Sequence, residues 1–563
     1  MDNVKSFGIS ITIVAVMANF SVASASLFVN VSVTGLGIVQ GTRNNNAEIF
    51  KGIPFAEAPT GDLRFKPPKP ARWSGFRNAT RFGNVCPQRE YSSSRLVLNE
   101  DCLYLNIYRP AKRNGKLAVL VWIHGGSYIY GSASDYDGET LAARNGVIVV
   151  TIQYRLGVLG FFNIPNTDMK GNFGMLDQIE ALRWVKKHIA NFDGNPTKVT
   201  IFGVSAGGTS VSLLTLSPMI KDEGLFARAI AQSGVASNFW AVKKVTNDKI
   251  ARHFGRLLQC NDVEKLVTCL KGKTTREIIL KQELVANTTL LTSPVVDGHF
   301  LTELPLKQVA KNTLPKSHVP LMVGFTKNEG TYFAGDPRGC SKQSYEQTVK
   351  FLLKRIFGNE NRILETTVIH EYTRYLAGNL ALKWFDSTSD IYGDSAFYVD
   401  TINFADSWFR SGNAVYMYLF SHLPENLVFP QQKVAHGFER PYVFGYATVG
   451  SGWLYQKNYT AIDRNVSVQC MEMWVSFAKH GFPGKGWPKY RSDTRNYLNI
   501  KNPLTIESQL WPDRMAFWNK VVPQIMAGTK PQKCEDKAKA SSKAVEGLLS
   551  LLLLCFLFNQ FFL

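Results

Sequence analysis

Short apolar runs recur along the middle of the chain and predict buried strands. Residues 116–123 and 147–152 are rich in β-branched side chains and too short for helices, so both faces of each strand should be covered. Residues 176–192 carry apolar side chains at helical spacing, which predicts an amphipathic crossover helix. Further strands are expected at 199–202 and 227–232. Strand, helix and strand in this order predict a mostly parallel sheet wrapped by helices.

The second half of the chain continues the pattern. Apolar runs at 319–325 and 415–420 predict two more strands, and residues 467–480 predict a helix that ends at Gly481. No fixed-period repeat and no heptad pattern occurs. We therefore predict the α/β class, with a single large domain over residues 26–530.

The sequence around Ser205 is the first candidate for chemistry. Gly203-Val204-Ser205-Ala206-Gly207 follows the strand at 199–202 and precedes a helical segment, which is the context of a nucleophile elbow. Such a turn pushes the serine hydroxyl outward, and the glycines avoid side chains that would crowd it. The motif also arises by chance in a chain of this length, so the hypothesis depends on its surroundings.

Parallel sheets place functional groups at the carboxyl ends of their strands. The strand at 116–123 is followed by His124-Gly125-Gly126-Ser127, a glycine turn whose amides could face a cleft as an oxyanion hole. The alternative is an ordinary turn at a strand end. Ser205 favours the functional interpretation.

An acid and a base are expected after the serine, in the chain order serine, acid, histidine. Glu329 follows the strand at 319–325, and Asp297 is the rival acid. Beyond Glu329 the chain has four histidines. His370 and His480 fall in predicted helices and His422 at a strand end, whereas His436 lies in a loop beside a glycine. We expect His436 to be the base.

Five ordered motifs carry a resemblance to a known family. They are Glu100-Asp-Cys-Leu-Tyr-Leu-Asn106, the glycine turn at His124, Tyr154-Arg-Leu-Gly157, Gly171-Asn172 through Asp177-Gln178, and the serine elbow. Between about residues 35 and 523 the chain resembles the type-B carboxylesterase and cholinesterase family. The resemblance implies an α/β-hydrolase fold and a catalytic triad of Ser205, Glu329 and His436.

The resemblance also implies further site residues. These are oxyanion donors at Gly126, Ser127 and Ala206, an aromatic acyl-pocket residue at Trp240, and disulfides Cys86–Cys102 and Cys260–Cys269. The short separation within each cysteine pair independently favours these disulfides. Cys340, Cys470 and Cys534 stay unassigned. A homodimer is left open.

Three departures from the family pattern affect substrate choice. Val204 replaces the usual glutamate, Ser127 replaces a third glycine, and no tryptophan lies between Cys86 and Cys102, where cholinesterases carry a choline-binding one. We therefore expect a serine hydrolase acting through an acyl-enzyme on neutral short- to medium-chain carboxylic esters, with no metal or organic cofactor. The alternative is a neuroligin-like adhesion protein, and the intact triad counts against it.

Charge changes this picture little. The 563 residues include 64 Lys and Arg against 44 Asp and Glu, a net charge of +20. The basic residues are scattered and accompany no nucleic-acid motif, so we expect no nucleic-acid partner.

Both ends of the chain predict export to the cell surface. Residues 1–25 have the form of a cleaved signal peptide. Residues 531–546 form a polar linker with small residues, and the apolar tail at 547–563 carries no basic residue after it, which is typical of a glycolipid (GPI) anchor signal. The alternatives are secretion and a retained tail anchor. Five glycosylation sequons agree with export: Asn30, Asn78, Asn287, Asn458 and Asn465.

Overall fold

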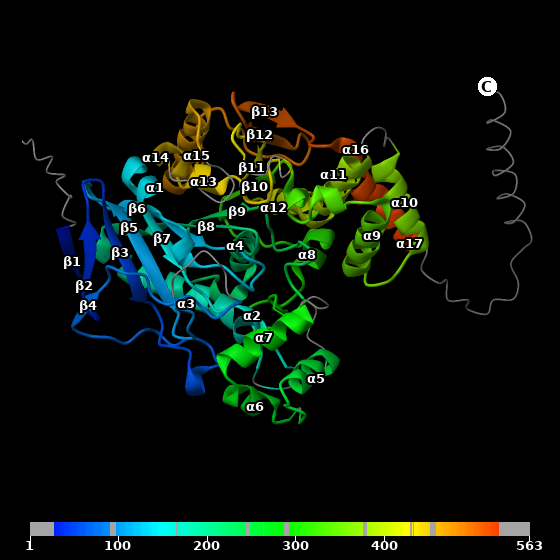
Figure 1. Cartoon of the computed structure of the whole chain (residues 1–563). Helices are drawn as coiled ribbons and strands as arrows, with labels where there is room; N and C mark the ends of the chain where they lie inside the picture. Colours follow the sequence, from blue (N-terminus) through cyan, green and yellow to red (C-terminus); the bar gives the residue numbers. More distant parts are fainter. Residues whose placement is uncertain are drawn as a thin grey trace, which may run out of the picture.

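A single mixed sheet forms the centre of the molecule (Figure 1). The computed structural model describes residues 27–89, 97–164, 167, 169–243, 248–262, 264–286, 292–374, 380–427, 431, 433–450 and 458–528. The expected signal peptide, linker and apolar tail, together with Asn287, lie outside these residues. Among the described residues, no helix is both long and apolar enough to cross a membrane.

The sheet has 13 strands within the described residues, in the order β1-β2-β3-β5-β7-β6-β8-β9-β10-β11-β12-β13, with β4 paired to β2. From β7 to β12 all neighbours are parallel, whereas β1, β2, β3, β5 and β7 pair antiparallel, as do β12 and β13. The strands are β1 (Leu27–Val33), β2 (Gly37–Arg43), β3 (Ala47–Pro54), β4 (Phe76–Asn78), β5 (Tyr104–Pro110), β6 (Leu117–Ile123), β7 (Ile148–Ile152), β8 (Gly194–Val204), β9 (Arg228–Gln232), β10 (Leu321–Thr326), β11 (Val415–Phe420), β12 (Asn496–Ile500) and β13 (Thr505–Ser508). The parallel centre confirms the predicted fold class.

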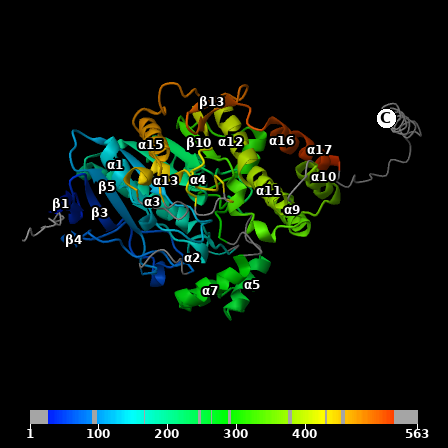
Figure 2. The same ribbon diagram turned by 45° about the horizontal axis from the view of Figure 1, so that its top comes forward.

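Helices cover both faces of this sheet and extend one end of the molecule. Figure 2 shows α5 and α7 on one side of the sheet, and α9, α10, α16 and α17 gathered at the end remote from β1. The helices are α1 (Glu139–Asn145), α2 (Gly157–Phe161), α3 (Phe173–His188), α4 (Ala206–Leu216), α5 (Asp248–Leu257), α6 (Leu266–Gly272), α7 (Thr275–Ala286), α8 (Pro305–Lys311), α9 (Lys342–Phe357), α10 (Arg362–Thr373), α11 (Leu380–Gly393), α12 (Val399–Arg410), α13 (Arg440–Val443), α14 (Tyr446–Val449), α15 (Ala461–His480), α16 (Pro512–Ala516) and α17 (Val522–Gly528).

Strand β6 explains why the central runs are apolar throughout. Val119 and Val121 pack into a core cluster on the face that α3 and α4 cover. Leu120 and Trp122 pack into the cluster on the opposite face, with α1 and α15. Because successive side chains of a strand point to opposite faces, a strand with two covered faces has no polar position.

The crossover helix differs from the predicted one. It begins earlier, at Phe173, and gives way to a 3₁₀ turn at Ile189–Phe192. Its first half is buried on nearly all sides, including polar Asp177 and Gln178. Asp177 accepts two hydrogen bonds from the Arg155 guanidinium, so its charge is compensated inside the protein. An apolar stripe alone therefore underestimated how much of this helix is covered.

The other expected strands and the last helix are present with shifted ends. β8 is longer than predicted because its first residues also pair with β6, as at Leu117 and Gly194. The final helix, α15, begins six residues earlier than predicted, at Ala461, where Thr460 and Asp463 form a capping box. Gly481 ends it in the left-handed conformation, as predicted.

Candidate active site

Ser205 occupies a sharp turn between β8 and α4. Its backbone angles, φ 59° and ψ −126°, lie in a sparsely populated region. The Ser205 amide donates a 2.8 Å hydrogen bond to the carbonyl of Gln232, which holds the turn against β9. A Cβ on Gly203 or Gly207 would lie 2.5 or 2.1 Å from the carbonyl oxygen of Ile123. Close packing against β6 is thus the reason that both positions are glycine.

Glu329 and His436 meet at the carboxyl ends of the strands. Glu329 is fully buried in the turn after β10, and its Oε2 lies 2.5 Å from Nδ1 of His436. Its other oxygen accepts hydrogen bonds from the amide of Thr326 at 2.7 Å and the hydroxyl of Ser233 at 2.5 Å. Both carboxylate oxygens are therefore used, which fixes the carboxylate and orients the imidazole.

The second nitrogen of the His436 ring is available for chemistry. Nε2 is buried and makes no hydrogen bond in the described part of the chain, with Ser205 or with any other residue. The ring centroid lies 4.9 Å from that of Phe397 and 5.6 Å from that of Phe333. Because Glu329 binds Nδ1, Nε2 is the position at which this imidazole can take up a proton.

The glycine turn after β6 lies beside Ser205. A Cβ on Gly125 would come within 3.0 Å of the Ser205 Cβ. Gly126, Ser127 and Tyr128 have φ values of 107°, 55° and 61°, so three successive residues adopt left-handed conformations. Such a turn presents consecutive amides to one side, as anion-binding loops do. Two non-glycine residues in this region indicate strain beside the serine.

One further amide and a histidine complete this region. Ala206 is the first residue of α4, where helix amides lack partners within the helix. His124 is fully buried, and burial lowers its pKa to about 4, so it is neutral near pH 7. It stacks on Tyr154, with ring centroids 4.4 Å apart. We assign His124 a structural part in holding the turn.

The two expected pocket residues lie in different surroundings. Trp240 is half-buried, donates from Nε1 to the carbonyl of Ala396 at 2.8 Å, and contacts Phe397, which in turn contacts His436. Val204 is only 2% exposed and belongs to the core cluster that includes Phe438. Val204 therefore acts on the site through packing, with almost no exposed surface of its own.

Sequence reasoning missed Phe333 and Phe397. Phe333 lies four residues after Glu329, a spacing that could have indicated it. Phe397 lies in a short π-helical segment, Asp394–Tyr398, far from any motif. The local sequence around an aromatic residue in a helix does not distinguish packing in the core from packing against an imidazole.

The rival residues have other partners. Oδ1 of Asp297 accepts hydrogen bonds from the amides of His299, Phe300 and Leu301, so this carboxylate stabilises its own loop. His422 pairs with Asp463 at 2.7 Å. His370 lies in α10 and His480 in the last turn of α15.

The disulfides Cys86–Cys102 and Cys260–Cys269 are both formed, which confirms the predicted pairings. Cys340 and Cys470 are free thiols, and Cys534 lies outside the described residues. Four sequon asparagines are exposed: Asn30, Asn78, Asn458 and Asn465. Within the described residues, no group of three or more His, Cys, Asp or Glu side chains is placed to hold a metal ion.

Comparison with known proteins shows the family of the chain. Residues 25–518 match the carboxylesterase family. The chain belongs to the carboxylesterase family. Carboxylesterase 1C of Mus musculus is 36% identical over 86% of this chain and 90% of its own length. Acylcarnitine hydrolase of Rattus norvegicus is 34% identical over 93% of this chain and 96% of its own length. Neuroligin-3 of Mus musculus is 33% identical over 84% of this chain and 66% of its own. The family, together with the carboxylesterase and acylcarnitine hydrolase relatives, supports an ester hydrolase.

Proposed function

We propose that this carboxylesterase-family protein hydrolyses neutral short- to medium-chain carboxylic esters through an acyl-enzyme on Ser205. His436 takes the hydroxyl proton through Nε2 as the Ser205 oxygen attacks the ester carbonyl. The proton then passes from Nε2 to the leaving alcohol, and water attacks the acyl-enzyme with His436 again acting as base. Glu329 holds the tautomer that leaves Nε2 free and stabilises the imidazolium.

The amides of Gly126, Ser127 and Ala206 are the proposed donors to the oxyanion. Ser127 contributes only its main chain to this role, so replacing the family's glycine there need not remove a donor. Each well-placed donor stabilises the transition state by on the order of 3 kcal/mol. The close approach of Gly125 to Ser205 supports this placement.

The observation that carries the proposal is the contact between Glu329 and His436. These residues are 107 positions apart in sequence, and their pairing leaves one buried imidazole nitrogen without a partner. A protein that only binds its partners has no need of this arrangement. Phe333, Phe397 and Trp240 add apolar surface, which suits an uncharged acyl group.

Active-site titration with an organophosphate tests the proposal. Wild-type protein should incorporate one equivalent on Ser205 and hydrolyse aryl butyrates, and Ser205→Ala should lose both properties. Ser212→Ala is the matched control, because the Ser212 hydroxyl donates to carbonyls of its own helix, those of Gly208 and Thr209. Equal turnover by wild type and Ser205→Ala would reject the proposal and favour a neuroligin-like adhesion protein.

We also propose that residues 26–530 form one secreted domain that is held at the cell surface through a C-terminal glycolipid. This rests on the sequence of the two ends. Phosphatidylinositol-specific phospholipase C should then release the protein from intact cells. Protein that stays bound and still carries residues 556–563 would indicate a retained tail instead.

A further inference from the structure

A cavity of about 560 Å³ lies between α8, α12, β12 and α16, apart from the candidate active site. None of Ser205, Glu329 and His436 lines it. One part of its lining is apolar and another part is polar. Apolar side chains come from α8, α12 and α16, among them Leu306, Ile402 and Met515. Charged and amide side chains come mainly from α12, α16 and the segments that flank β12.

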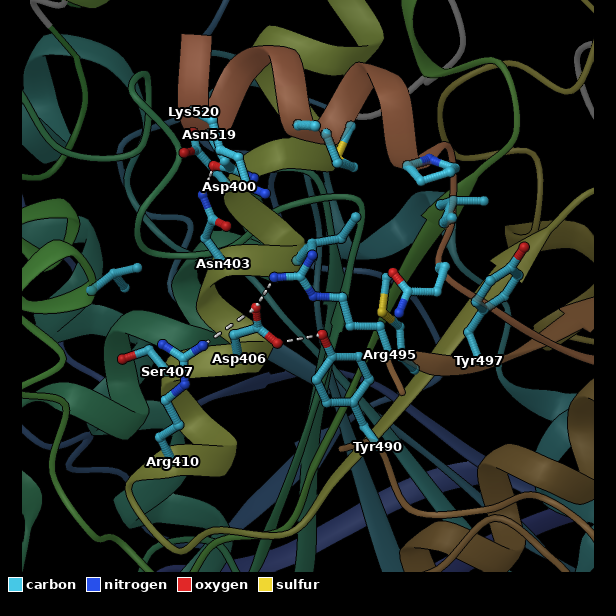
Figure 3. Close-up of a pocket in the computed structure, with 18 of the residues that line it drawn as sticks. Asp400, Asn403, Asp406, Ser407, Arg410, Tyr490, Arg495, Tyr497, Asn519 and Lys520 are labelled. Atoms are coloured by element: carbon cyan, nitrogen blue, oxygen red, sulfur yellow. Dashed lines mark hydrogen bonds and ion pairs between the residues drawn. The ribbon is translucent and has the colours of Figure 1, made fainter. Parts of the chain in front are cut away.

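Both carboxylate oxygens of Asp406, on the polar side of the cavity, already have partners within the protein. Asp406 is nearly buried, and its Oδ1 accepts a 2.7 Å hydrogen bond from the hydroxyl of Tyr490. Its Oδ2 accepts one of 2.7 Å from Arg495 and lies 4.0 Å from the guanidinium of Arg410. Figure 3 shows the two arginines approaching this carboxylate from opposite sides. Asp406 therefore has little capacity left for a cationic ligand.

The basic residues, by contrast, keep unused donors. Nε of Arg495 is buried and has no hydrogen-bond partner in the described part of the chain. Arg410 retains half of its side-chain exposure, and its contact with Asp406 is long. Lys520, which is exposed and also lines the cavity, adds a third positive charge. An unpaired buried donor is costly, so an acceptor from a ligand would be favourable here.

Asp400, which also lines the cavity, weakens the case for a cation further. It accepts hydrogen bonds from the amide of Phe239 and the side chain of Asn238, and burial raises its pKa to about 7. Asp400 thus carries only part of a negative charge near neutral pH. The remaining acid, Asp513, is exposed to solvent.

We propose that this cavity is a binding site for a small carboxylate with an apolar chain. The carboxylate is held by Arg495 and Arg410, and the chain packs on Leu306, Ile402 and Met515. Charge-assisted hydrogen bonds from arginine to a carboxylate are stronger than neutral ones, and burial of each methylene of the chain adds to the affinity. The site does not depend on the proposed ester hydrolysis, although the acids released by such a reaction have this chemistry.

The test is calorimetric titration of octanoate into the full-length protein that carries Ser205→Ala. Ala516→Phe fills the cavity and should abolish binding. Arg410→Gln removes one charge and should weaken binding by about tenfold. Arg338→Gln is the matched control, since Arg338 is an exposed arginine away from the cavity, and it should leave binding unchanged.

The charge of the ligand is tested with heptyltrimethylammonium, which has the same seven-carbon chain as octanoate and the opposite charge. It should bind at least tenfold more weakly than octanoate. Equal binding of the two ions, or octanoate binding that survives both Ala516→Phe and Arg410→Gln, would overturn the proposal. A cooperative unfolding transition of Ala516→Phe near the wild-type denaturant concentration reports whether that variant is folded. These results stand whether or not Ser205 proves to be the nucleophile.

Discussion

Glu439 accepts a 2.9 Å hydrogen bond from the side-chain amide of Gln232. The carbonyl of Gln232 accepts in turn from the amide of Ser205, and Glu439 lies three residues after His436. One buried contact therefore ties the segment that carries the proposed base to the turn that carries the proposed nucleophile.

Replacement of Glu439 by glutamine should be tolerated. Burial, with the charge of Glu329 adding to it, raises the pKa of the Glu439 carboxyl and favours its neutral form, which Gln resembles. In a denaturant titration, the midpoint of unfolding of Glu439→Gln should lie near that of wild type. Glu439→Ala leaves the Gln232 amide unpaired and should lose about 1–3 kcal/mol in the same measurement. Equal losses in the two variants would contradict this view.

Glu329→Gln should lower kcat by about three to four orders of magnitude with little change in KM. Glutamine cannot accept from His436, Ser233 and Thr326 together, so the imidazole loses its fixed tautomer. Steady-state kinetics with an aryl butyrate measures the effect. Asp297→Asn is the control and should keep kcat near the wild-type value. The triad assignment fails if Asp297→Asn proves to be the more damaging change.

Neutral esters should be better substrates than choline esters. The matched pair is 3,3-dimethylbutyl butyrate and butyrylcholine. The neutral ester has a quaternary carbon atom at the position of the charged nitrogen of butyrylcholine. Val204 supplies no carboxylate next to the nucleophile, so the attraction for a cation is reduced. We expect the higher kcat/KM for the neutral ester at about 0.15 M salt, where long-range charge effects are screened. A clear preference for butyrylcholine would mean that other residues form a cation site.

Lys243 should make stability depend on pH. This side chain is 3% exposed, its Nζ donates to the carbonyl of Phe161 at 2.8 Å, and burial lowers its pKa from 10.5 to about 7. Between pH 7 and 10.5 the unfolded chain binds a proton that the folded protein does not. The Lys243 contribution to stability therefore rises with pH by about 1.4 kcal/mol per unit in that window.

Lys243→Met removes this dependence. The measurement is the free energy of unfolding of both proteins at pH 7.5 and at pH 9.5. The difference, variant minus wild type, should be about 2–3 kcal/mol larger at pH 7.5 than at pH 9.5. Lys307→Met, at an exposed lysine, is the control and should show no such change. The same difference from wild type at both pH values would mean that Lys243 titrates normally in the folded protein.

The sequence by itself determined the parallel centre of the sheet and the candidate chemistry. The run 117–123 has no polar position because both faces of β6 are covered, and that is visible in the order of residues alone. The serine turn is recognisable from its local sequence, although the reason for the glycines at 203 and 207, the close approach of β6, is seen only in the structure. Chain order, together with the loop position of His436 beside a glycine, then favoured Glu329 and His436 over the other acids and histidines.

Only the tertiary structure decided what surrounds these residues. The antiparallel pairing of β5 with β3 and β7 joins distant segments, and the burial of Asp177 follows from its contact with Arg155. Phe397 contacts His436, and Asp406 is saturated by two arginines and a tyrosine, because the fold brings separate elements together. Local periodicity records which face of an element is covered, and it holds no information about which distant side chain covers it.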